Sequence, residues 1–276
     1  MRDDEKREMI DSSLIAHRSS LRKPRRRFYA PPDAFAPGVL SVTLPPDETR
    51  HLRDVLRLGR GDEVFVFDGE GKEYACVVEQ VGRDAAALSV SEEVEAARPE
   101  SSLRLTLALA LLKGEKFDLV TQKATELGVE RIVPVVTKLA DVRLRDERDA
   151  ARRTARLSRI ALEAAKQSGR ARVPTVDAPI MFRALIESAS TVDGGLRLFF
   201  SERDGGGLVE AIRPDAGRER RVVALVGSEG GWTDEELSQG SDAGWSIVTL
   251  GGRTLRAETA AITVTALLQH LMGDLR

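Results

Sequence analysis

Two glycine-bearing turns near the carboxyl end carry the residues best suited to chemistry. The first is Gly-Ser-Glu-Gly-Gly at residues 227–231, and the second begins at Gly251-Gly252; each follows a short apolar run and leads into a helix start. Turns of this kind at the carboxyl ends of neighbouring strands form the crevice in which open α/β sheets bind ligands. The sequence therefore predicts a pocket for a nucleoside-like cofactor beside a catalytic surface. The charged residues at its rim are Glu229, Arg253, Arg256 and Glu258.

Several other kinds of site find little support. The first turn lacks the Gly-Lys-Ser/Thr of a phosphate loop, and its G-x-x-G-G spacing is not the dinucleotide fingerprint. His17, His51 and His270 are far apart in the sequence, so no metal is expected. No G-x-S-x-G elbow indicates a serine hydrolase. Taken singly, the first turn could be an ordinary strand-to-helix turn, and the region around Glu258 an ordinary helix start.

The composition is typical of a soluble cytoplasmic protein. The chain has 276 residues, of which 42% are hydrophobic and 31% charged, with a net charge of -2. One large domain or two modest ones fit this length, and any nucleic-acid contact must come from a local patch. The single Cys76 excludes an internal disulfide. The longest apolar run, at residues 103–112, is too short to cross a bilayer, so no membrane partner is expected.

The elements that must position the turns begin after a polar extension at residues 1–26. This extension ends in a basic run, which is either a solvated tail or an arm for phosphates. The next segment favours a small β-barrel, because many short strands surround one helix, predicted at residues 46–56. The strands are expected at residues 28–30, 39–43, 63–67, 73–79 and 86–90.

A second domain is predicted after the linker-like residues 96–102. Strand and helix patterns alternate from there, which indicates a mainly parallel sheet with helices packed on it. Thr233 and Glu236 have the spacing of a capping box. Strands are expected at residues 103–112, 131–136, 196–200, 222–226 and 246–250, and helices at residues 116–127, 147–167 and 258–271.

Several motifs, in order along the chain, resemble those of the RsmE-type 16S ribosomal RNA uridine-N3 methyltransferases, which belong to the SPOUT class. In the second domain the motifs lie at residues 113–116, 122–128, 167–174, 227–231 and 250–260. Residues 27–29, 51–57 and 67–71 also match the first domain of that family. The resemblance covers about residues 27–272 and does not include the extension.

The resemblance implies a PUA-like β-barrel at residues 27–98 that binds RNA. It implies a SPOUT methyltransferase domain at residues 99–276, with a parallel sheet and a C-terminal trefoil knot. The cofactor would be S-adenosyl-L-methionine, and the substrate 16S rRNA or the 30S subunit. A homodimer with active sites near the subunit interface is also implied. The product would be 3-methyluridine.

Site residues follow from this interpretation. Glu258 is the candidate base for the N3 proton, and Arg256 the candidate for stabilising the uridine anion or binding a phosphate. The arginines of residues 143–159 alternate with acids and are expected to be mostly solvated or paired. Cofactor contacts are expected from Leu225, Val226, Gly227, Glu229, Gly230, Gly231, Leu250, Gly251, Arg253, Leu255 and Thr259. RNA contacts are expected from Arg25, Arg26, Arg27, Arg53, Arg57, Lys113, Arg170 and Arg172.

Three alternatives stay open at this point. One is a SPOUT enzyme that methylates a ribose 2′-hydroxyl. Another is a non-catalytic protein of the same fold that binds RNA or assists ribosome assembly. The third, from sequence physics alone, is a nucleotide-binding α/β enzyme of another kind. Locating a methyl group on base or sugar, and comparing binding of S-adenosylmethionine, ATP and NAD, would separate them.

Overall fold

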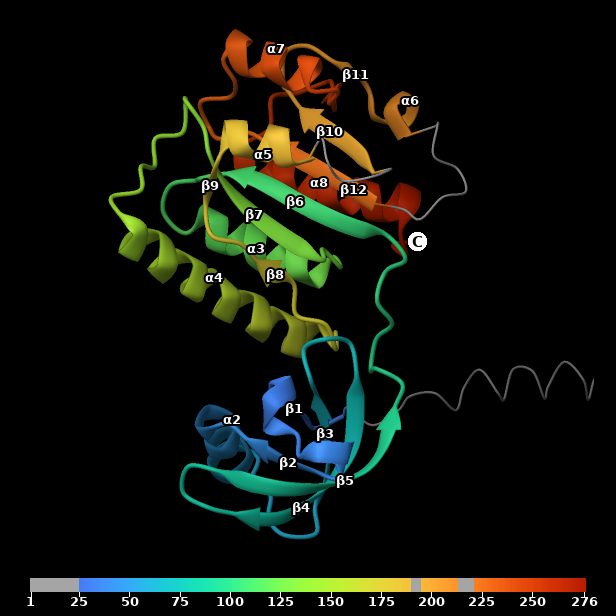
Figure 1. The fold of residues 1–276 in the computed structure, drawn as a ribbon. Coiled ribbons are helices and arrows are strands. Elements are labelled where there is room, and N and C mark those ends of the chain that lie inside the picture. The colour runs from blue at the N-terminus through green and yellow to red at the C-terminus, as the bar shows by residue number, and fades with distance from the viewer. Residues whose placement is uncertain (1–24, 190–194, 213–220) are drawn as a thin grey trace, which may run out of the picture. The chain divides into compact units, whose positions relative to one another are not determined.

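The computed structural model describes residues 25–189, 195–212 and 221–276, which form two compact units (Figure 1). The first unit runs to Val94 without residues 68–72, and the second comprises residues 68–72 and everything from Glu95 onward. Residues 68–72 hydrogen bond within the second unit, where the Val173 amide donates to the Gly69 carbonyl at 2.9 Å. Of the expected extension at residues 1–26, all but Arg25 and Arg26 lie outside the described residues.

The first unit is a small curled sheet of five strands in the order β1-β3-β4-β5-β2. Its pairs are antiparallel except that β1 runs parallel to β3. The expected helix at residues 46–56 is α-helical for one turn and then changes to a π-turn, after which Arg57 adopts a positive φ of 53°. The elements are β1 (Arg27–Tyr29), η1 (Pro32–Ala34), η2 (Pro37–Val39), β2 (Ser41–Leu44), α2 (Pro46–Arg50), η3 (His51–Val55), β3 (Glu63–Phe67), β4 (Glu73–Val81) and β5 (Ala86–Val94).

A buried carboxylate fastens the start of this unit. Glu73 is fully buried and accepts hydrogen bonds from Arg25 at 2.9 Å and from Arg27 at 3.0 Å. The two arginine side chains are 11% and 8% exposed, and the Arg27 guanidinium also stacks 4.6 Å from the centre of the Phe67 ring. A buried charge must be paired, so these arginines complete the fold. Arg25 and Arg27 thus have a structural role, and their expected contact with RNA stays a prediction.

The second unit contains an eight-stranded sheet whose described strand pairs are all parallel. The strand order is β11-β13-β10-β12-β6-β7-β8, with β9 beside β7. The alternation of strand and helix expected from the sequence is confirmed. The elements are β6 (Arg104–Ala110), α3 (Lys116–Glu126), β7 (Arg131–Val136), α4 (Glu147–Ser168), β8 (Thr175–Val176), β9 (Ile180–Met181), α5 (Phe182–Ala189), β10 (Leu196–Phe200), β11 (Gly206–Gly207), α6 (Leu208–Ile212), β12 (Arg221–Val226), α7 (Asp234–Asp242), β13 (Ser246–Thr249) and α8 (Ala257–Met272).

Helices cover both faces of this sheet (Figure 1). Successive side chains of a strand point to opposite faces. In β6, Leu107 and Leu109 join the core that includes α3, α4 and α8, whereas Ala108 joins the core that includes α5 and Trp232. A parallel sheet buried on both faces explains why its strands are nearly continuous apolar runs in the sequence. The trefoil knot stays a prediction.

Arg170 is an internal tie of the second unit. It is 5% exposed, and its guanidinium donates to a Glu100 carboxylate oxygen at 2.7 Å and to the carbonyl oxygens of Thr125 at 2.8 Å and Val129 at 3.0 Å. A phosphate contact would require these bonds to break, and the freed carbonyl groups are buried with few other donors. Arg170 thus has a structural role as well, and its expected contact with RNA stays a prediction.

Replacing Arg170 by alanine should lower the free energy of unfolding by about 3 kcal/mol, because Glu100 and two carbonyl groups lose their donor. Urea denaturation followed by the fluorescence of Trp232 and Trp245 reports on this unit, because both indoles are buried in it. The matched control is Arg172→Ala, whose side chain is 45% exposed and should cost under about 1 kcal/mol. Equal losses in the two variants would contradict the structural role of Arg170.

Candidate active site

The register of the parallel strands brings three loops to one edge of the sheet. Phe200, at the end of β10, pairs with Val226 at the end of β12 and with Val248 in β13. The loops that follow these strands therefore leave the sheet side by side. One expectation needs correction, since the glycine turns follow strands that flank β10 and are not adjacent. Two strand spacings, about 10 Å, separate them.

The first turn, at residues 227–231, is closely packed by segments that are distant in the sequence. A Cβ atom added at Gly230 would lie 2.5 Å from the carbonyl oxygen of Leu139, in the loop after β7. A Cβ atom at Gly231, whose φ is 67°, would lie 2.6 Å from a carboxylate oxygen of Glu202, in the loop after β10. Glycine is required at Gly230 by the Leu139 backbone, and it is favoured at Gly231 by the positive φ, since the Glu202 side chain could move.

The residues after the first turn hold it in place. The indole of Trp232 donates to the carbonyl oxygen of Phe200 at 2.9 Å and so ties the turn to the end of β10. The predicted capping box is confirmed, because Thr233 and Glu236 each accept a hydrogen bond from the other's amide at the start of α7. Glu236 also accepts from the Lys138 amide at 2.9 Å. The loop after β7 is thereby fixed to the same helix start.

The second turn is open where the first is packed. Gly251 and Gly252 have φ values of 67° and 72°, and no atom lies within 4 Å of a Cβ atom added at either position. Arg253 and Arg256 follow, and both are exposed. Neither guanidinium makes a hydrogen bond or an ion pair within the described ranges of the chain. The second turn thus combines free space with two unpaired cations.

Lys116 links the first glycine turn to the start of α8, the helix that follows the second glycine turn. Its ammonium lies 2.8 Å from a carboxylate oxygen of Glu229, in the first glycine turn, and 3.6 Å from one of Glu258, at the start of α8. The sequence predicted both acids at the rim of one pocket, and the structure brings them to the same cation. Lys116 belongs to the motif at residues 113–116 but was not among the predicted site residues. Lys113, the lysine expected to contact RNA, pairs with Asp141 at 2.7 Å.

The Lys116–Glu229 pair persists across the neutral pH range. Burial opposes ionisation of Glu229, but the hydrogen bond and charge of Lys116 outweigh it, so the pKa of Glu229 lies below its ordinary 4.5. The hydrogen bond to Glu229 raises the pKa of Lys116 above its ordinary 10.5. The stabilisation from Glu229 is lost only as pH falls through its lowered pKa. That from Lys116 is lost only as pH rises through its raised pKa.

Glu258 has unused hydrogen-bonding capacity. Its side chain is 14% exposed, and its Oε2 atom is buried without a hydrogen-bond partner in the described residues. The hydroxyl groups of Ser228 and Thr137, which also follow β12 and β7 at this edge, are in the same state. Buried polar atoms rarely lack partners. This cluster of unsatisfied groups therefore favours a ligand-binding role for the edge.

The other residues expected to bind a cofactor lie near the two turns but differ in exposure. Leu225 and Val226 are buried in the sheet, so only their backbone groups face the turn. Leu250 and Leu255 are partly buried, and Thr259 is exposed in the first turn of α8. No group of metal-ligating side chains occurs in the described part of the chain.

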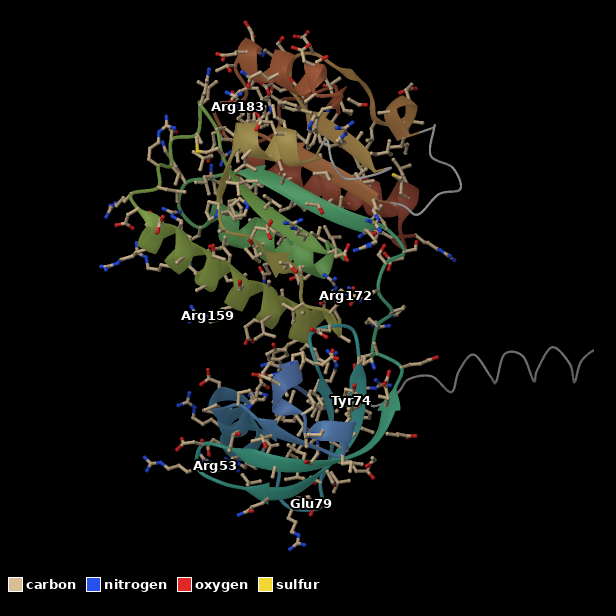
Figure 2. The ribbon with its side chains drawn as sticks, viewed as in Figure 1. Arg53, Tyr74, Glu79, Arg159, Arg172 and Arg183 are labelled. Atoms are coloured by element: carbon tan, nitrogen blue, oxygen red, sulfur yellow. The ribbon has the colours of Figure 1, made fainter. Side chains whose placement is uncertain are left out.

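The residues expected to bind RNA divide into exposed side chains and side chains held by other contacts; Figure 2 labels two of them, Arg172 and Arg53. Arg26 is 54% exposed, Lys113 62% and Arg172 45%, and Arg57 is exposed as well. Arg53 is more constrained, since it donates to Asp54 and to two backbone carbonyl groups of the loop after β4. None of the described helices is long and apolar enough to cross a membrane.

The sequence matches two families of known domains. An RNA methyltransferase domain matches residues 99–269, and an RNA methyltransferase PUA domain matches residues 44–91. A ribosomal RNA small subunit methyltransferase E of Synechocystis sp. is 32% identical over 234 residues, which cover 84% of this chain and 74% of the relative.

Solved structures agree with these matches. A ribosomal RNA small subunit methyltransferase E from Neisseria gonorrhoeae, bound to S-adenosylmethionine, has a TM-score of 0.79 and 33% identity, and the match covers 91% of this chain and 100% of that one. A methyltransferase from Legionella pneumophila, solved with the same cofactor, has a TM-score of 0.78 and 30% identity, covering 91% and 99% of the two chains.

The packing of the first turn can be tested with alanine at two glycines. Gly230→Ala should lower the free energy of unfolding by about 1–3 kcal/mol, because the new methyl group collides with the Leu139 backbone. Gly251→Ala meets no neighbour and should cost about 1 kcal/mol, through its positive φ alone. Thermal unfolding by circular dichroism measures both. A smaller loss for Gly230→Ala than for Gly251→Ala would refute the close packing of the first turn.

Proposed function

This chain belongs to the RNA methyltransferase family, and we propose that it methylates N3 of a uridine in 16S ribosomal RNA with S-adenosylmethionine as the donor. Membership rests on the domain match over residues 99–269. The substrate class is supported by relatives named ribosomal RNA small subunit methyltransferase E, one of which was solved with S-adenosylmethionine. The observation that carries the proposal is the convergence of Glu229 and Glu258 on Lys116 beside two glycine turns.

The turns fit a nucleoside-containing cofactor. Close approach of a ligand to the backbone requires positions without side chains, and the space beside Gly251 and Gly252 is open. The buried Ser228 hydroxyl offers an unused polar group. When bound, S-adenosylmethionine supplies a methyl group activated by a sulfonium. The residues proposed to hold it are Leu225, Val226, Gly227, Glu229, Gly230, Gly231, Leu250, Gly251, Arg253, Leu255 and Thr259.

The acceptor nitrogen needs help from the protein. Uridine N3 carries a proton at neutral pH and is a poor nucleophile until the proton is removed. We assign this role to Glu258, whose Oε2 atom lies 3.6 Å from the Lys116 ammonium and accepts no hydrogen bond from the described residues. The Arg256 guanidinium, which pairs with none of the described residues, can stabilise the negative charge left on the uracil oxygens. Since N3 lies on the pairing edge of the base, the nucleotide must be unpaired or flipped out.

The partners in this proposal are ribosomal RNA and a second copy of the chain. The first unit, which matches an RNA methyltransferase PUA domain, offers Arg26 and Arg57 to RNA, and the second offers Lys113 and Arg172. Leu119 of α3, 42% exposed, is an apolar residue available to a homodimer interface. Light scattering of the purified protein tests the dimer. The proposed compartment is the cytoplasm, where bacterial ribosomes are assembled.

Deletion of the gene should remove one 3-methyluridine from 16S rRNA, and expression of the protein should restore it. Nucleoside mass spectrometry of digested rRNA measures both results, with unmodified nucleosides as the internal standard. A lost ribose methylation would instead favour the 2′-hydroxyl as acceptor. If no methyl group disappears while the purified protein still binds 16S rRNA, the non-catalytic alternative is correct.

Glu258→Gln should lower kcat by about 10²–10⁴-fold, since the amide cannot accept the N3 proton. Its affinity for S-adenosylmethionine in calorimetry should stay that of the wild type. Arg256→Ala should likewise lose turnover much more than cofactor binding. Glu235→Gln is the control, because this carboxylate is exposed and pairs with Lys138 on the surface. Wild-type turnover in Glu258→Gln would remove its assignment as the base.

A further inference from the structure

The second unit carries a concentrated positive surface that the proposed mechanism does not use. Residues 143–159 contain seven arginines and three acids, which leaves a charge of +4, in a chain whose net charge is -2. The segment covers the end of the loop after β7 and the first turns of α4. Local positive charge on an otherwise acidic protein indicates a surface that binds a polyanion.

Much of this charge is not neutralised. The guanidinium groups of Arg145, Arg148 and Arg159 make no hydrogen bond or ion pair with the described residues, and Figure 2 marks Arg159 on α4. Arg143 bonds only to backbone carbonyl oxygens among those residues, which leaves its charge in place. The expected mixture of paired and solvated arginines is therefore present. Arg152, Arg153 and Arg156 pair with carboxylates, and the other four arginines make no ion pair with the described residues.

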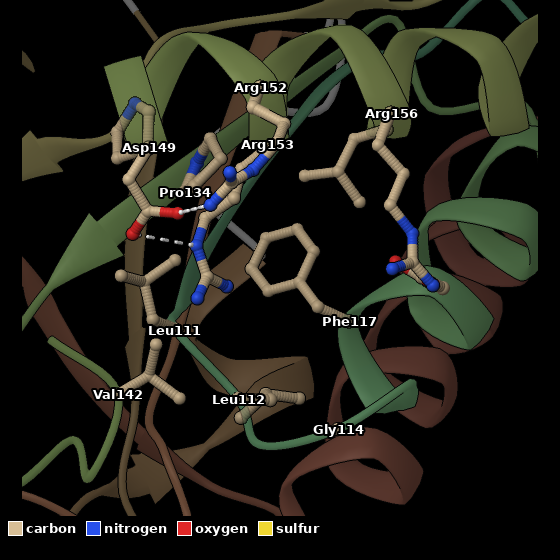
Figure 3. Close-up of a pocket in the computed structure, with 13 residues that line it drawn as sticks. Leu111, Leu112, Gly114, Phe117, Pro134, Val142, Asp149, Arg152, Arg153 and Arg156 are labelled. Atoms are coloured by element: carbon tan, nitrogen blue, oxygen red, sulfur yellow. Dashed lines mark hydrogen bonds and ion pairs between the residues drawn. The ribbon is translucent and has the colours of Figure 1, made fainter. Parts of the chain in front are cut away.

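A cavity of about 390 Å³ lies beside this segment (Figure 3). Its walls are mainly apolar, and they come from the segment after β6, from α3, from β7, from the loop after β7, from α4 and from Pro179 before β9. A volume near the lower end of the range for small-molecule sites is enough for one nucleobase. The wall residues that matter for the argument are Leu112, Phe117, Pro134 and Val142.

Three arginines line this cavity with spare donor capacity. Asp149, which is 7% exposed, accepts a hydrogen bond from Arg152 at 2.7 Å. The Nε atom of Arg153 lies 3.6 Å from the same carboxylate, and it is buried without a hydrogen-bond partner in the described residues. Arg156 pairs with Asp118. Three guanidinium groups thus face two carboxylates, which leaves one positive charge and an unused donor at the cavity.

The cavity and the candidate active site share one edge of the sheet. Leu112 follows the carboxyl end of β6, and the loop that contains Val142 follows that of β7. Strand β6 is the direct neighbour of β12, with Leu109 paired to Val226 just before the first glycine turn. Adjacent strands are about 5 Å apart. A chain of nucleotides that reaches one site can therefore reach the other.

We propose that this cavity binds an unpaired nucleotide of the RNA strand beside the target uridine. The base enters the apolar space, and the flanking phosphates contact the arginines of α4. Many proteins bind single-stranded RNA in this way: unstacked bases enter apolar or aromatic pockets, and arginines contact the phosphate backbone. A mainly apolar interior beside a segment of charge +4 matches a base and its phosphates. The identity of the RNA rests on the proposed function.

The phosphate contacts can be tested by binding of naked 16S rRNA at several KCl concentrations. The double variant Arg152→Gln, Arg156→Gln should bind about tenfold more weakly, and the slope of log K against log[KCl] should fall by about 0.7 for each phosphate that the variant no longer neutralises. Arg183→Gln is the matched control, since this arginine of α5 is 81% exposed and pairs with Glu187. An unchanged slope in the double variant would overturn the role of these arginines in phosphate binding.

Insertion of a base into the cavity is tested with a variant that alters no charge. Val142→Phe fills the cavity and should weaken RNA binding while the salt slope stays that of the wild type. Should the arginine double variant fold poorly in thermal unfolding, Arg145→Gln with Arg148→Gln repeats the charge test at side chains that the described residues leave unpaired. Wild-type affinity in Val142→Phe would overturn base insertion.

RNA binding at the cavity and methylation of the uridine can be rejected independently. Normal uridine methylation with unaffected RNA binding in every variant would reject the cavity alone. Altered RNA binding without any uridine methylation would reject the proposed reaction alone. Calorimetry with S-adenosylmethionine should give wild-type affinity throughout, because none of these side chains lies in the glycine turns.

Discussion

The parallel pairing of β10 with β12 on one side and β13 on the other determines which loops can meet. Phe200 sets the level at which both neighbours end, so the residues that follow each strand emerge together. Trp232 and the glycines of the first turn then draw those loops close. A shift of this register by one residue would turn every side chain of a strand to the other face of the sheet. The strand register of the sheet thus positions the site, and the individual residues of the loops complete it.

Within that frame, charges divide the carboxyl edge into parts with different chemistry. Around Lys116, two carboxylates share one ammonium, and the Oε2 atom of Glu258 accepts no hydrogen bond from the described residues, which suits proton removal. Around α4, arginines outnumber acids, which suits attraction of a polyanion. The second glycine turn adds open space and two guanidinium groups that the described residues leave free. In the proposed reaction, one edge of the sheet can therefore hold the methyl donor, the acceptor uridine and the flanking RNA strand, because its parts differ in the sign of their charge.

The sequence predicted those features that depend on local pattern. The alternation of strand and helix, the capping box at Thr233 and the two glycine turns all follow from residues within a few positions of each other. It could not predict features created by distant pairing. Arg27 and Arg170 were expected to contact RNA, and only the fold reveals the carboxylates that pair with them. The expectation that the strands before the two glycine turns are neighbours was wrong for the same reason, because no local signal places β10 between β12 and β13. The short elements β8, β9 and β11 carry too few residues to show a period.

The order of the central strands also governs when this sheet can form. Strand β6 needs β12 as its partner, and these segments lie far apart in the chain. Such non-local closure is entropically expensive and slows folding. During synthesis from the amino end, one edge of β6 therefore stays unpaired until β12 has been synthesised and has left the ribosome. Nascent chains halted before that point would present an apolar strand edge, which is a template for aggregation and a target for chaperones.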